Sequence, residues 1–103
     1  MNIKNFESYI ELKIRHRGYG YYEHGAIEEI EQVGNKEFSA TVAGSDEYLV
    51  FIKLDSHNNV VDHSCDCPYD WGDVCKHEVA VMYHIKNHRL YEQATKGNLF
   101  DRL

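Results

Sequence analysis

The pattern of apolar and polar positions predicts a helix near each end of the chain. Within residues 3–15, apolar residues recur at helical spacing, and charged residues fill the positions between them. Gly18 and Gly20 follow and are expected to end this first helix. A second helical pattern runs from about residue 74 to residue 86 and is apolar on nearly every side. We therefore expect the second helix to be largely buried against a sheet.

The middle of the chain predicts four strands separated by turns. Residues 37–43 and 48–54 show the two-residue repeat of a strand, whereas the apolar positions of residues 25–33 alternate poorly. A fourth strand is predicted over residues 60–67, and Pro68 ends it because proline cannot donate to a strand ladder. The order of one helix, four strands and one helix is that of a small α+β domain.

The length and net charge of the chain exclude several classes of protein function. A chain of 103 residues has the size of one domain, so residues 1–103 are treated as a single unit and the large soluble enzyme folds are excluded. No apolar run approaches the roughly 18 to 20 residues of a membrane span, and the N-terminus mixes charges into its apolar residues, unlike a secretory signal. We expect a cytoplasmic protein without a membrane partner. Its net charge of −6 argues against a nucleic-acid binder that acts through bulk charge.

The three cysteines are the most informative residues, since all lie between positions 65 and 75. An odd number leaves one thiol over in any closed disulfide scheme, and a bridge between Cys65 and Cys67 would close a strained loop. A chain without a secretory signal is expected in a reducing compartment, where disulfides are rare. Clustered thiols in such a protein are more often metal ligands.

The cysteines form a Cys-x-Cys pair, a seven-residue spacer and a Cys-x-His pair, at Cys65, Cys67, Cys75 and His77. Three thiolates and one imidazole are the ligand set of a closed, four-coordinate structural zinc site. Residues i and i+2 of a strand point to one face, so Cys65 and Cys67 can reach the same ion. Residues i and i+2 of a helix lie about 200° apart, so Cys75 is expected just before the second helix or in its irregular first turn.

This pattern resembles the SWIM zinc-binding domain, and the resemblance extends to the residues around the ligands. Cys65 to Tyr69 reads Cys-x-Cys-Pro-Tyr, and Cys75-Lys76-His77 leads into an apolar helix. Upstream, the segment from Arg17 to Tyr22, followed by Gly25, is similar to the Arg-Gly-x-x-Tyr-Tyr stretch of that family. The likeness covers roughly residues 15–86. It implies a small antiparallel sheet whose last strand is joined to the following helix by one structural Zn²⁺.

The resemblance also implies a role in DNA-associated machinery, such as the domains at the N-terminus of bacterial Swi/Snf-type helicases. The sequence contains no Gly-rich phosphate loop and no nucleophile with an oriented base, so we expect neither catalytic residues nor a small-molecule substrate. The acidic balance favours a protein partner over DNA, because an acidic domain repels phosphates at long range. Direct DNA binding as a helicase accessory domain and thiolate-based redox or metal sensing stay open as alternatives.

Several side chains near the motif have two interpretations. His63 shares strand parity with Cys65 and either replaces a ligand or is an ordinary strand histidine. His84 and His88, four residues apart, either bind metal on a helix face or lie at a solvated helix end. The tyrosines form either a stacking platform or packing at a helix-to-strand junction (Tyr19, Tyr21 and Tyr22).

The loop and the tail carry two further predictions. Trp71 is either an exposed anchor for a partner or a lid over the zinc. Residues 89–103 contain a short helical pattern and three late apolar residues, which either dock onto this domain or lead into a larger protein. The only basic cluster is modest and lies in the first predicted helix, mainly over residues 13–17.

Overall fold

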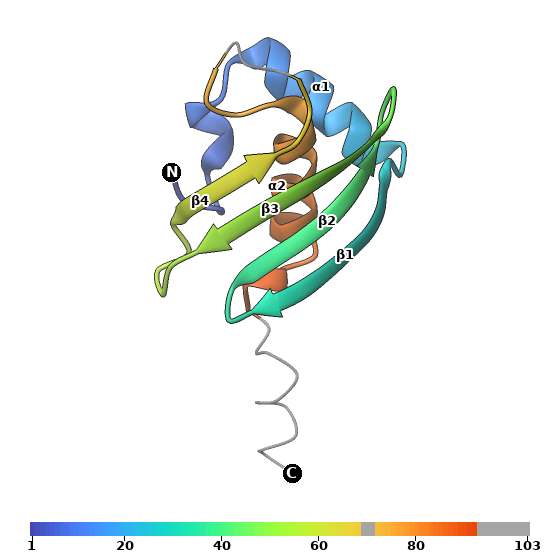
Figure 1. Ribbon diagram of the computed structural model, residues 1–103. Coiled ribbons are helices and arrows are strands. Elements are labelled where there is room, and N and C mark those ends of the chain that lie inside the picture. The colour runs from blue at the N-terminus through green and yellow to red at the C-terminus, as the bar shows by residue number, and fades with distance from the viewer. Residues whose placement is uncertain (69–71, 93–103) are drawn as a thin grey trace.

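A four-stranded antiparallel sheet and two helices form the fold in the computed structural model, which describes residues 1–68 and 72–92 (Figure 1). The strands lie side by side in chain order, β1-β2-β3-β4. The α+β class predicted for the chain is confirmed. The elements are the short 3-10 helix η1 (Phe6–Tyr9), α1 (Leu12–Glu23), β1 (Ile27–Gly34), β2 (Glu37–Ala43), β3 (Glu47–Leu54), β4 (Val60–Cys65), α2 (Lys76–Asn87) and the 3-10 helix η2 (Leu90–Glu92).

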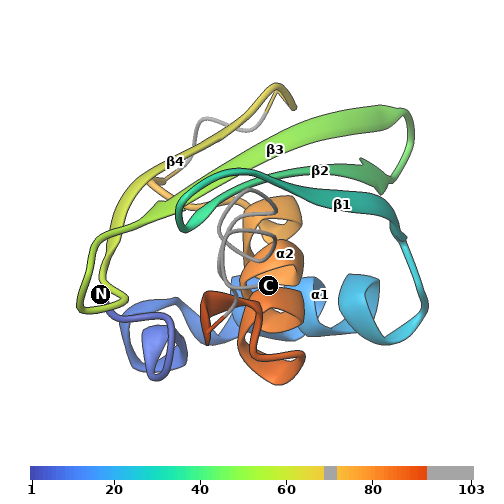
Figure 2. The ribbon, with the colours of Figure 1, turned by 90° about the horizontal axis from the view of Figure 1, so that it is seen from below.

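Both helices lie on the same side of the sheet, with α2 against the strands and α1 beside it (Figure 2). The sheet face toward α2 carries the alternate apolar residues of the two central strands, which are buried (Phe38, Ala40, Val42, Val50, Ile52 and Leu54). Opposite them α2 buries nearly all of its apolar residues, as the sequence pattern predicted. Removing these apolar surfaces from water is the main stabilising contribution, about 25 cal/mol per Å². None of the described helices is long and apolar enough to cross a membrane.

The first predicted helix is wrong in its position. Residues 3–15 do not form one helix; instead η1 comes first and α1 runs from Leu12 through Gly18 and Gly20 to Glu23. The reason is the neighbouring helix. A Cβ added to Gly18 would lie 2.6 Å from Val79 Cβ on α2, so glycine lets the two helices approach closely. The packing gained there outweighs the cost of glycine in a helix, about 1 kcal/mol relative to alanine.

Two strands differ from their expected form for local reasons. In β1 the register shifts between Ile27 and Glu29, and this irregularity explains why the apolar positions did not alternate cleanly. The prediction that β4 extends through residue 67 is wrong, since β4 ends at Cys65. At the next residue the Asp66 carboxylate accepts a hydrogen bond from the Leu49 backbone N–H at 2.9 Å, in place of a ladder carbonyl.

Candidate metal centre

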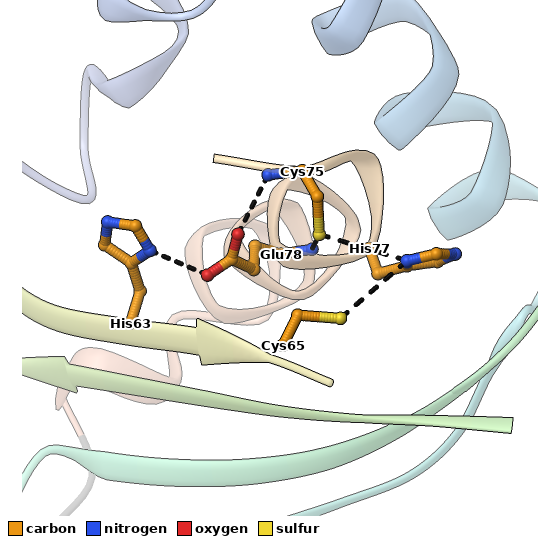
Figure 3. A network of polar contacts seen from close by, with 5 residues as sticks. All are labelled: His63, Cys65, Cys75, His77 and Glu78. Carbon is orange, nitrogen blue, oxygen red and sulfur yellow. Dashed lines mark hydrogen bonds and ion pairs between the residues drawn. The ribbon is translucent and has the colours of Figure 1, made fainter. Parts of the chain in front are cut away.

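The four predicted ligands come from two neighbouring elements and meet between them. Cys65 is the last residue of β4, and Cys67 follows it by two residues. Cys75 is the N-cap of α2, in extended backbone geometry, and His77 lies in the first turn of that helix. The expected place of Cys75, just before the helix, is therefore confirmed. One ligand atom from each of the four side chains lies within 4.8 Å of the others, and three of these residues are drawn in Figure 3.

The separations suit a single tetrahedral ion. His77 Nδ1 lies 3.8 Å from Cys65 Sγ and 3.9 Å from Cys75 Sγ (Figure 3). With metal–sulfur bonds of about 2.3 Å and a metal–nitrogen bond of about 2.0 Å, ligand atoms at tetrahedral angles lie about 3.6 Å apart. The donor set and its spacing thus fit Zn²⁺ without a large rearrangement.

The start of α2 holds Cys75 in place through a reciprocal pair of hydrogen bonds. The Cys75 backbone N–H donates to Glu78 Oε1 at 2.8 Å, and the Glu78 backbone N–H donates to Cys75 Sγ at 3.5 Å. This is a capping box in which a cysteine takes the place of the usual serine or threonine. The same sulfur therefore caps the helix and faces the other three clustered side chains.

Glu78 also connects the helix to β4. Its second carboxylate oxygen, Oε2, accepts a hydrogen bond from His63 Nδ1 at 2.6 Å (Figure 3). The hydrogen bond to Glu78 raises the pKa of His63 above its ordinary value. His63 is thus paired with a carboxylate and lies outside the thiol cluster, which supports its interpretation as a strand histidine. Sequence reasoning missed Glu78, although the spacing of Cys75 and Glu78 is that of a capping box.

The ring of His77 is enclosed by tyrosines on its far side. Its centroid lies 4.5 Å from that of Tyr48 and 5.2 Å from that of Tyr21. Its Nε2 atom is buried and has no hydrogen-bond partner among the described residues. A Cβ added to Gly44 would lie 3.1 Å from this nitrogen, so a larger residue there would crowd the ring. The ring is therefore fixed with Nδ1 toward the cysteines.

Comparison with known families gives one result. Residues 48–86 match the family model of the SWIM zinc finger. The matched segment contains all of β4 and nearly all of β3 and α2, together with the four clustered side chains. Comparisons with curated proteins and with solved structures give no match. The match and the Cys₃His cluster together support one structural Zn²⁺.

Burial shifts the pKa of three of the clustered side chains, Cys65, Cys75 and His77. It raises the pKa of Cys65 to about 11, and it raises the pKa of Cys75 further. Both thiols therefore keep their protons at neutral pH until a metal displaces them. Burial, and after it the positive charge of Lys76, lowers the pKa of His77, so the ring is neutral and able to bind a metal.

The remaining candidates behave as packing residues. Tyr19 and Tyr22 contact the Tyr83 ring of α2, so these two rings pack between the helices α1 and α2. The rings of His84 and His88 stack with centroids 4.3 Å apart. Among the described residues, the cluster of Cys65, Cys67, Cys75 and His77 is the only group of three or more Cys, His and carboxylate side chains close enough to hold a metal. The predictions for Trp71 and for residues 93–103 lie outside the described residues.

Proposed function

We propose that Cys65, Cys67, Cys75 and His77 are the four ligands of one structural zinc ion. We propose further that residues 1–103 act as a single non-enzymatic recognition domain for a protein partner in DNA-associated machinery, in the reducing cytoplasm. The convergence of these four donors carries the proposal. Four protein ligands leave no open position for water or substrate, so the ion would stabilise the fold without catalysing a reaction.

The position of the cluster supports a structural role. It joins the end of β4 to the start of α2, two elements that are also linked by the hydrogen bond between His63 and Glu78. A domain of this size has a marginal core, and a structural zinc ion can contribute about 10 to 16 kcal/mol of apparent binding free energy. SWIM zinc fingers are binding domains, often for protein or DNA, which suits a recognition function.

Charge favours protein over DNA as the partner. The chain has seventeen acidic and eleven basic residues, and this balance opposes association with phosphates. One observation favours the alternative of direct DNA contact. Arg17 and Lys76 line a cavity of about 330 Å³ beside the ligands, together with the rings of Tyr21 and Tyr48. Cations beside aromatic rings are the usual means of binding single strands.

A titration of the zinc-loaded protein with single- and double-stranded DNA separates the two partners. At near-physiological salt we expect no binding tighter than about 10⁻⁴ M, the weak end of non-specific association. The Arg17→Gln variant should behave like the parent. Micromolar binding that weakens with salt and is lost in Arg17→Gln, but not in the control Lys13→Gln, would replace protein recognition with DNA recognition. Mass spectrometry of the native protein should show one zinc ion per chain.

A further inference from the structure

The second face of the sheet is covered by no helix of residues 1–68 and 72–92. Both helices lie on one side, and the described residues place no helix on the other (Figure 2). Because cross-strand partners share a face, the register identifies the side chains there. Phe51 pairs with Ser39 of β2 and Ser64 of β4. These two partners are small, and Phe51 itself is half-buried. Leu49, two residues earlier on the same face, is 56% exposed.

Carboxylates surround this apolar centre. The register places five of them at outward positions of the four strands (Glu29, Glu31, Glu37, Glu47 and Asp62), and Lys53 is the only cation at such a position. Within the described part of the chain, none of the five takes part in an ion pair. A sixth carboxylate, Glu28, lies beside Glu47, and this neighbouring carboxylate raises the pKa of Glu28. The face is therefore apolar at its centre and negative around it, with one cation, Lys53, opposite Glu37 and Asp62.

We propose that this face, defined by Leu49 and Phe51 and the surrounding carboxylates and called here the acidic sheet face, docks a basic protein segment. An apolar side chain of that segment packs on Phe51 and Leu49, and its lysines or arginines pair with the carboxylates of β1. The inference rests on the proposed protein-recognition function and names the surface and the chemistry of the partner.

Charge decides between the possible occupants. A second copy of the chain would bring two sets of carboxylates together, and like charges facing each other across an interface cost several kcal/mol. Nucleic acid and anionic lipid would be repelled in the same way. A basic segment instead gains faster association from long-range attraction, and the buried apolar anchor supplies affinity.

The test uses the full zinc-loaded chain and a short fluorescent peptide with lysines on both sides of one tryptophan. A second peptide with glutamates in place of the lysines serves as its control. Fluorescence anisotropy should show binding of the lysine peptide only, weakening with salt. Replacing Phe51→Ser should weaken it about tenfold or more, the loss typical of an interface anchor. Leu49→Thr provides a second, milder change, and circular dichroism and zinc content check that both variants fold.

A matched pair of charge reversals tests whether the surface itself binds the peptide. The test variant carries Glu29→Lys and Glu31→Lys on the acidic sheet face. The control variant carries Glu11→Lys and Glu23→Lys, which change the net charge equally at exposed positions at the ends of α1. The first pair should weaken binding about tenfold and the second less than about twofold. Equal losses in both pairs, or equal binding of the glutamate peptide, would overturn the proposal. So would self-association of the parent that Phe51→Ser relieves, because the face would then join two copies.

The acidic sheet face and the proposed function can be disproved independently of each other. Loss of the predicted peptide binding, in a protein that also does not bind DNA, removes the acidic sheet face and leaves recognition of a protein elsewhere on the domain. Micromolar DNA binding that depends on Arg17 removes the proposed function itself, whatever the peptide does.

Discussion

The first turn of α2 and the turns that follow are held by different kinds of interaction. At the first turn, polar atoms dominate: Cys75 and His77 face the other two cysteines, and Glu78 binds both the helix cap and β4. Beyond it, the helix is held by apolar packing, with Val79 against Gly18 and Met82 fully buried. A chelator or acid can disrupt the polar contacts of the first turn, whereas the apolar packing changes only when a side chain is made larger or smaller. Each can therefore be tested with the other left intact.

The largest effect should come from removing the metal. Excess chelator, or the substitution Cys75→Ser, should unfold the domain by removing on the order of 10 kcal/mol of apparent stabilisation. Circular dichroism and elemental analysis measure the fold and the bound zinc. Ser64→Ala, beside Cys65 but on the other face of β4, is the control and should keep both. A Cys75→Ser protein that stays folded with one zinc ion would contradict the ligand assignment.

The second largest effect should come from acid, which weakens the binding of zinc by the cysteines. Because burial raises the pKa of Cys65 to about 11 and that of Cys75 further, zinc must displace thiol protons at neutral pH. His77, with its lowered pKa, is neutral and releases none. Up to three protons should leave per ion, so each unit fall in pH should cost up to about 4 kcal/mol of zinc affinity. Calorimetry of zinc binding in buffers of different ionisation enthalpy measures the number of protons released per ion. Release of no protons would exclude the thiols as ligands.

The apolar packing should respond to a single methyl group. Gly18→Ala places a Cβ against Val79 and should destabilise the protein by about 1 to 3 kcal/mol, the usual cost of overpacking. Gly20→Ala lies on the same helix with nothing within 4 Å of the added Cβ, and it should stabilise by up to about 1 kcal/mol. Urea unfolding measures both, and both variants should still bind one zinc ion. Equal effects at the two positions would show that the helices do not meet at Gly18.

The smallest effect should come from the link between β4 and α2. Glu78→Gln keeps an oxygen for the Cys75 N–H but removes the charge paired with His63, at a cost of about 1 kcal/mol. The pKa of His63, which the hydrogen bond to Glu78 raises, should fall toward its ordinary value in an NMR titration. The stabilisation by this pair is full below the ordinary histidine pKa and is lost as pH rises through the raised value. The stability difference between parent and variant should therefore shrink at high pH.

The sequence by itself determined the chemistry of the site and the central elements. The Cys-x-Cys and Cys-x-His pairs, with their spacing, predicted which side chains meet, and helix geometry predicted Cys75 at the start of α2. The strands β2 and β3 were predicted almost to the residue. These features follow from local rules: strand parity, helix periodicity and ligand preference depend on residues close together in the chain.

Only the tertiary structure decided where α1 lies and what its glycines do. Gly18 is a helix breaker by its own propensity, but the close approach of Val79, sixty-one positions further along the chain, makes it a packing site within the helix. The pairing of His63 with Glu78 likewise depends on β4 and α2 lying side by side. The acidic sheet face exists because both helices cover the same side of the sheet. In each case the deciding contact joins residues far apart in sequence, and packing energy then outweighs local preference.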